Sequence, residues 1–110
     1  MSEHYHDPGD LKFLKEMSKL APAEFNAWLG LDNIVRREDG AIPRKYRELI
    51  ALAVAFTTQC PYCVEVHVKG AKTAGASREE LAETSLIAAA LRAGGAATHG
   101  AMALKFYDHS

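Results

Sequence analysis

The sequence predicts an all-α protein, a compact bundle of about six helices in a single domain that spans residues 1–110. Three observations support this fold class. Apolar residues recur at steps of three and four along most of the chain, which is the spacing of one helix face. No stretch alternates between apolar and polar residues as a half-buried strand does. Prolines, glycines and a serine stand where the helical stretches begin and end.

The N-terminal third is expected to contain a loose tail and two helices. Residues 1–9 lack a periodic apolar pattern, which is typical of a terminus that is not packed on the domain. From Asp10, a residue type suited to an N-cap, leucine and methionine recur at three-residue steps and predict a short amphipathic helix. Pro22 begins a second helix, whose broad apolar stripe continues to about Arg36.

Two further helices are expected in the middle of the chain, one on each side of a break. Pro43 opens the first of them, and polar residues 57–59 loosen its end. Pro61 opens the second, because proline lacks an N–H and is accepted at the first helical position but not inside a helix. Gly75 is well suited to the position after the end of this helix.

The C-terminal part is expected to hold two helices. Ser77 and Glu80 form a capping box in sequence, which marks a helix start. The pair Gly94-Gly95 is expected to interrupt this helix, and a last helix continues to about Phe106. The many alanines and glycines of this region allow helices to pack closely, within a subunit or between subunits.

Composition excludes several classes of partner. A net charge of −1 gives no bulk attraction to nucleic acid or to an anionic membrane. No apolar run approaches the ~18 residues that a transmembrane helix needs, and the polar N-terminus has no signal-peptide pattern. We therefore expect a cytoplasmic protein. Its bulky apolar residues exceed what one small core hides and predict a homo-oligomer; they include Phe25, Trp28, Phe56 and Phe106.

The only two cysteines, Cys60 and Cys63, have a C-x-x-C spacing. Pro61 places Cys60 at an N-cap and Cys63 at about the third helical position, where unpaired N–H groups and the helix dipole favour an anion. The thiol of Cys63 is therefore expected to ionise more easily than a free cysteine. His67 follows one turn later on the same helix face. In a reducing compartment such a pair is more often redox-active or metal-binding than structural.

A carboxylate, Glu48, lies twelve residues before Cys60 on the preceding helix. If that helix were continuous, the two residues would be about 18 Å apart. The break at residues 57–59 must therefore fold the two helices together for Glu48 to reach His67. A nucleophile, a base and a group that orients the base would then meet in one place.

The order Glu48, Cys60, Cys63, His67, or E-x11-C-x2-C-x3-H, resembles the motif of the AhpD-like family within the carboxymuconolactone decarboxylase superfamily. The resemblance covers about residues 42–103 and is supported by the segments SREEL and RAGGAATHG. It implies an all-helical subunit that assembles into trimers or hexamers.

The resemblance also implies a function, that of a thiol-dependent peroxidase that cycles through a disulfide. In that scheme Cys63 attacks the peroxide, Cys60 resolves the product, and Glu48 and His67 relay the proton. The implied substrate is a small organic hydroperoxide. An external dithiol or lipoyl-type reductant is implied in place of a bound cofactor, and no metal is implied.

Two accessory residues are less firmly assigned. The alkylhydroperoxidase that names the family has a histidine between its cysteines, whereas this chain has Tyr62, whose simplest role is to cap the site against water. The tail around His99 resembles the decarboxylase branch of the superfamily. The simplest role of His99 is a hydrogen bond at an interface.

Other functions remain open on the same residues. A carboxymuconolactone decarboxylase-type lyase is one, although that branch lacks the cysteine pair. A zinc-binding module is another, since Cys60, Cys63 and His67 are ligand types of tetrahedral zinc and His99 or Glu48 would complete the set. The cysteines would be inert and buried in a purely structural module. The tetrapeptide CPYC occurs in glutaredoxin-like proteins, but their fold needs strands and a later proline, and none follows here.

Overall fold

The structure, a computed structural model, describes residues 7–110. A short 3-10 helix, η1 (Pro8–Lys12), precedes five α-helices: α1 (Phe13–Leu20), α2 (Pro22–Val35), α3 (Arg44–Thr58), α4 (Pro61–Thr73) and α5 (Arg78–Asp108). The described part of the chain contains no strand. The prediction of an all-α fold with about six helices is therefore confirmed.

Local sequence signals determine most of the helix ends. Cys60 is the N-cap of α4 and Pro61 its first residue. Ser77 and Glu80 form the capping box at the start of α5, with reciprocal hydrogen bonds of 2.9 and 3.1 Å. The break between α3 and α4 lies at Gln59, which adopts a left-handed conformation with φ 57°. These boundaries agree with the sequence prediction.

The predicted interruption at Gly94-Gly95 is wrong. α5 runs through both glycines as one helix of 31 residues. Each glycine in a helix interior costs only about 1 kcal/mol relative to alanine. The neighbouring residues are good helix formers and no proline follows, so the cost is not enough to end the helix.

The N-terminal boundary also differs from the prediction. Asp10 is not the N-cap of the first helix, because Asp7 caps η1 and the Asp10 side chain accepts a hydrogen bond of 3.0 Å from the Asp7 backbone N–H. The loose tail predicted for residues 1–9 falls largely on residues 1–6, which lie outside the described residues. Residues 7–9 form the cap and the first positions of η1.

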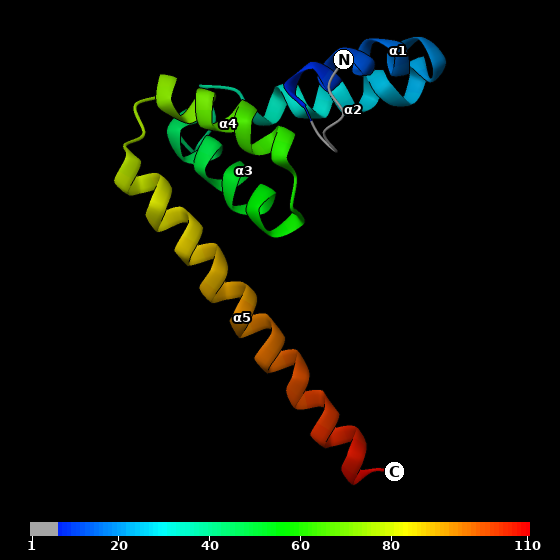
Figure 1. Ribbon diagram of the computed structural model, residues 1–110, viewed down its shortest axis with the longest axis vertical. Helices are drawn as coiled ribbons and strands as arrows, with labels where there is room; N and C mark the ends of the chain where they lie inside the picture. The colour runs from blue at the N-terminus through cyan, green and yellow to red at the C-terminus, as the bar shows by residue number, and fades with distance from the viewer. Residues whose placement is uncertain (1–6) are drawn as a thin grey trace.

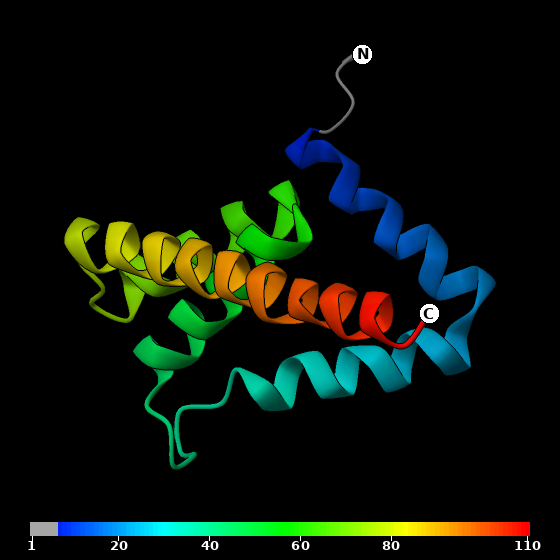
Figure 2. The ribbon, with the colours of Figure 1, turned by 90° about the horizontal axis from the view of Figure 1, so that it is seen from below.

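The helices form a central pair with two arms (Figure 1). α3 and α4 lie side by side and make the most extensive contact in the chain. The first half of α5 packs on α3, where Lys45 Nζ lies 3.0 Å from Glu80 and Arg92 donates a 2.8 Å hydrogen bond to the Thr57 carbonyl. The second half of α5 extends away from the pair (Figure 1). α1 and α2 form the other arm and diverge from their connection (Figure 2).

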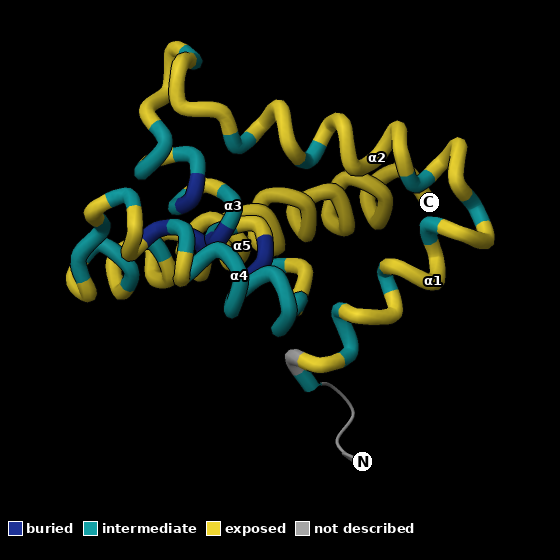
Figure 3. The backbone as a smooth tube through the Cα atoms, turned by 90° about the horizontal axis from the view of Figure 1, so that it is seen from above, coloured by how far each residue is buried: buried dark blue, intermediate teal, exposed yellow. Residues whose placement is uncertain are grey.

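Few residues of the single chain are buried. Those in the described part are confined to α3, α4 and α5 (Figure 3), namely Glu48, Leu52, Ala55, Ala71 and Ala88. The radius of gyration is 18.1 Å, whereas a compact domain of this length has about 13 Å. The chain alone therefore does not enclose a full core. No helix within residues 7–110 is long and apolar enough to cross a membrane.

Candidate active site

The cysteine pair lies at the N-terminal end of α4. Cys60 and Cys63 form a disulfide with their Cα atoms 5.3 Å apart, well within the range that a disulfide requires. The Cys60 sulfur also accepts a hydrogen bond of 3.2 Å from the backbone N–H of Cys63. Pro61 and the N-cap geometry thus place both sulfurs beside the unpaired N–H groups of the first turn.

The turn at Gln59 folds α4 back along α3 and brings Glu48 to His67. His67 Nδ1 lies 2.7 Å from Glu48 Oε2. α4 approaches this closely because Gly70 faces the carboxylate: a Cβ atom at position 70 would lie 2.7–2.8 Å from three atoms of the Glu48 carboxyl group. The fold-back that the sequence required for Glu48 to reach the site is present.

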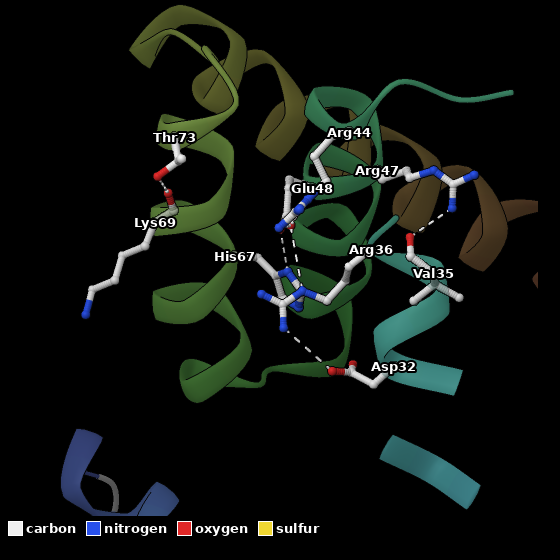
Figure 4. Close-up of polar contacts among 9 residues, drawn as sticks. All are labelled: Asp32, Val35, Arg36, Arg44, Arg47, Glu48, His67, Lys69 and Thr73. Atoms are coloured by element: carbon white, nitrogen blue, oxygen red, sulfur yellow. Dashed lines mark hydrogen bonds and ion pairs between the residues drawn. The ribbon is translucent and has the colours of Figure 1, made fainter. Parts of the chain in front are cut away.

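Glu48 is almost fully buried, with 1% of its surface exposed. Its Oε1 accepts a hydrogen bond of 2.8 Å from Arg44 Nε and forms an ion pair with Arg44 Nη2 at 2.8 Å, while Arg36 Nε lies 3.9 Å from the same oxygen (Figure 4). Burial raises the pKa of the Glu48 carboxyl, but the hydrogen bonds from His67 and Arg44 outweigh it and hold the net pKa below its ordinary value. Glu48 is therefore an ionised carboxylate at neutral pH.

An ionised Glu48 determines how His67 carries its proton. A carboxylate oxygen only accepts hydrogen bonds, so Nδ1 of His67 must donate. In the neutral ring Nε2 then holds the free lone pair and can take up a proton. His67 is half-buried and lines the same cavity as Cys63. A base and a thiol thus share one compartment.

This compartment, the thiol cavity, has a volume of about 240 Å³. Most of its wall is apolar and comes from η1, α1, α2 and α4, while Asp32, Arg36 and His67 provide a polar end. The other lining residues are Leu11, Leu14, Phe25, Trp28, Leu29, Tyr62, Cys63 and Val66. Such a cavity suits a small, largely apolar molecule with one polar group.

A second cavity of about 300 Å³ lies on the Glu48 side and shares the same three polar residues. Arg36 pairs with Asp32 at 3.7 Å. The polar end of the thiol cavity therefore separates an apolar compartment at Cys63 from a compartment that reaches Glu48.

The structure brings the four predicted catalytic residues to one region. Cys60 forms the disulfide with Cys63, Cys63 and His67 both line the thiol cavity, and His67 is hydrogen-bonded to Glu48. Among the accessory candidates, Tyr62 lines the cavity beside Cys63. The other, His99, is exposed on the second half of α5 and does not line this cavity.

Two arginines at the site were not predicted from the sequence to be site residues. Arg44 lies four residues before Glu48 on α3, and this spacing is itself a signal for an ion pair on a helix. Arg36 comes from the end of α2, and its position depends on the path of residues 37–43, so no local pattern indicates it. Within residues 7–110 no group of three or more histidine, cysteine, aspartate and glutamate side chains is placed to hold a metal ion.

Comparison with known proteins identifies the family. Residues 22–106 match the carboxymuconolactone decarboxylase family. The chain is 43% identical over 95 residues to an uncharacterised protein of the cox locus of Paracoccus denitrificans, covering 86% of this chain and 85% of that protein. An uncharacterised protein of Cupriavidus necator is 33% identical over 92 residues, covering 84% and 80%. The crystal structure of the apo form of a carboxymuconolactone decarboxylase family protein from Legionella pneumophila superposes with a TM-score of 0.61 at 33% identity, covering 90% of this chain and 84% of that one. With its all-α fold and a match over most of its length, the chain belongs to the carboxymuconolactone decarboxylase family.

Proposed function

We propose that this protein is a thiol-dependent peroxidase of the AhpD-like branch, which reduces small organic hydroperoxides through the Cys60–Cys63 pair. The observation that supports it most directly is the thiol cavity, in which Cys63 lies with a histidine whose other nitrogen is held by a buried, ionised carboxylate. This is the arrangement of a nucleophile, a base and an orienting group.

The first step oxidises Cys63. His67 Nε2 accepts the thiol proton, and the first turn of α4 stabilises the resulting thiolate. The sulfur attacks the terminal oxygen of the hydroperoxide, so that an S–O bond forms and the O–O bond breaks. The leaving alkoxide takes the proton from His67 and departs as an alcohol. Cys63 is left as a sulfenic acid.

The second step closes the disulfide. The Cys60 thiol attacks the sulfenic sulfur, the S–S bond forms, and the hydroxyl leaves as water with the Cys60 proton. The Cα separation of 5.3 Å in the disulfide lies within the range that such a bond requires. An external dithiol, of which a lipoyl group is one example, then exchanges with the disulfide and is itself oxidised. No bound cofactor is required, and a cytoplasmic location would supply the reductant.

Glu48 has an orienting role in this mechanism. A proton relay through Glu48, as the family resemblance implies, would require this carboxylate to become protonated. The hydrogen bond and the ion pair with Arg44, together with a pKa below the ordinary value, oppose protonation. Glu48 instead fixes the His67 tautomer and stabilises the imidazolium that forms when the thiol ionises.

The test is peroxide consumption by single cysteine variants. Cys60→Ser lacks the resolving thiol, so it should consume about one equivalent of hydroperoxide and react with a sulfenic-acid probe. Cys63→Ser lacks the attacking thiol and should do neither. The reverse pattern would exchange the two roles. Turnover that survives in both variants would contradict cysteine catalysis, and release of carbon dioxide from a carboxylate substrate by both variants would favour the lyase alternative.

A further inference from the structure

The segment of residues 10–14 lies at the thiol cavity although it is outside the family match, which begins at residue 22. It contains the end of η1 and the beginning of α1. Two of its side chains, Leu11 and Leu14, line the cavity together with Cys63. One wall of the thiol cavity is thus built from a segment that the family match does not include.

A hydrogen bond connects this segment to the redox centre. The Tyr62 hydroxyl donates to Asp10 Oδ2 at 2.7 Å, across 52 residues of sequence. The same oxygen accepts the Asp7 backbone N–H at 3.0 Å, so the cap of η1 fixes the carboxylate. Tyr62 stands between the two cysteines, in the first turn of α4.

Neither η1 nor α1 makes an extensive contact with α4. A cavity of about 250 Å³ lies on the same segment and is lined by Asp10, Leu11, Phe13, Leu14, Met17 and Tyr62. Away from the segment, α1 makes its main contacts with α2. The Tyr62–Asp10 hydrogen bond is therefore an important restraint on the distance between residues 10–14 and α4.

We propose that the Tyr62–Asp10 hydrogen bond holds residues 10–14 as the outer wall of the thiol cavity, and that this wall limits the size of molecules that reach Cys63. The cavity of about 240 Å³ is smaller than pockets that take drug-sized ligands, which start at about 300 Å³. The substrate class is then a hydroperoxide with a short alkyl chain or a single aryl ring. The identity of the substrate rests on the proposed function, whereas the limit on access to the thiol does not.

The test compares a small and a bulky thiol reagent on the full-length protein. The Cys60→Ser background leaves Cys63 as the sole thiol, and its alkylation rates with iodoacetamide and with pyrene maleimide are measured. Tyr62→Phe keeps the ring and removes the hydroxyl, and Asp10→Ala removes the acceptor. Each should raise the ratio of bulky to small rates about tenfold, the change in population expected when one hydrogen bond to a carboxylate is lost.

Three further measurements make the result decisive. The effects of the two single variants should not multiply in the double variant, because both changes remove the Tyr62–Asp10 hydrogen bond. Tyr107→Phe, at an 80% exposed tyrosine near the end of α5, is the matched control and should leave the ratio unchanged. Consumption of hydroperoxide by the Cys60→Ser protein with Tyr62 intact is recorded in parallel.

Ratios that stay constant in both single variants, or that rise equally in the Tyr107→Phe control, would overturn the proposal. Equal acceleration of both reagents would do the same, since the wall would then not select by size. If the ratio of bulky to small rates rises as expected but the protein consumes no hydroperoxide, the size limit set by residues 10–14 is supported and the peroxidase function is refuted. If the ratio stays constant while consumption is normal, only the size limit is refuted.

Discussion

Gly70 offers a sensitive test of the Glu48 geometry, because alanine at this position inserts a single methyl group against the carboxylate. The Cβ atom would lie 2.7 Å from Glu48 Cδ and 2.8 Å from each oxygen. Ordinary contacts between such atoms begin near 3.5 Å, so Glu48 or α4 must move by about 0.7 Å. Glu48 is held on one side by Arg44 and on the other by His67, at 2.8 and 2.7 Å.

The expected magnitude follows from two opposing terms. Replacing glycine by alanine inside a helix stabilises it by about 1 kcal/mol. Overpacking of a filled site costs about 1–3 kcal/mol. Gly70→Ala should therefore leave the free energy of unfolding unchanged or lower it by up to about 2 kcal/mol. Gly30→Ala and Gly94→Ala are matched controls, because a Cβ meets no atom within 4 Å at either position, and each should stabilise the protein by about 1 kcal/mol.

Urea unfolding followed by far-UV circular dichroism gives the three free energies at one protein concentration, with the disulfide intact. We expect Gly70→Ala to fall below both controls by about 1–3 kcal/mol. In the Cys60→Ser background, where Cys63 is a free thiol, its alkylation should also slow, because displaced Glu48 no longer orients His67. Stabilisation of Gly70→Ala equal to that of the controls, with unchanged thiol reactivity, would refute the close approach of α4 to Glu48.

Two further predictions concern the charge network and assembly. Arg44→Gln removes the hydrogen bond and the ion pair that Arg44 makes with Glu48 and should lower the free energy of unfolding by about 1–3 kcal/mol at neutral pH, unlike Arg78→Gln at the exposed start of α5. The pKa of Glu48 is lowered in the folded protein, so this stabilisation is present above about pH 5 and is lost as the pH falls through the lowered pKa. If the wild type and the variant keep the same difference in free energy of unfolding in acid, the stabilisation does not come from the ionised Glu48. Light scattering should give three or six times the subunit mass of 12.0 kDa, and Phe106→Glu, at a 58% exposed position, should reduce the mass. A wild-type species of 12.0 kDa at micromolar concentration would exclude the proposed oligomer.

Helix starts were predictable because the signals that set them are local. Pro61 can occupy only the beginning of a helix, and the Ser77 capping box satisfies N–H groups within four residues. The same local signals made it possible to predict that Glu48, Cys63 and His67 belong together. Their spacing fixes their helical positions, and the break before Pro61 allows only a fold-back to join them. Helical geometry and the residues that start and end helices were enough to predict this part of the site.

Features that depend on the sum of weak terms, or on contacts distant in sequence, were not predictable. The continuity of α5 through Gly94 depends on whether a cost of about 1 kcal/mol per glycine exceeds the stability of the flanking turns. Arg36 reaches Glu48 only because the loop after α2 takes one particular path. The hydrogen bond from Tyr62 to Asp10 spans 52 residues, and no periodic pattern connects its ends.

Assembly and access to the thiol are expected to be linked, because the same residues serve both. Trp28 and Leu29 line the thiol cavity with one face, yet they remain 48% and 37% exposed in the single chain. With a radius of gyration of 18.1 Å and a small buried core, the single chain leaves much apolar surface exposed. A copy packed on α2 would bury the outer faces of these two side chains and hold the cavity wall in place. Dilution below the dissociation constant of the oligomer should therefore loosen the α2 side of the thiol cavity, and the ratio of bulky to small alkylation rates at Cys63 should rise with dissociation.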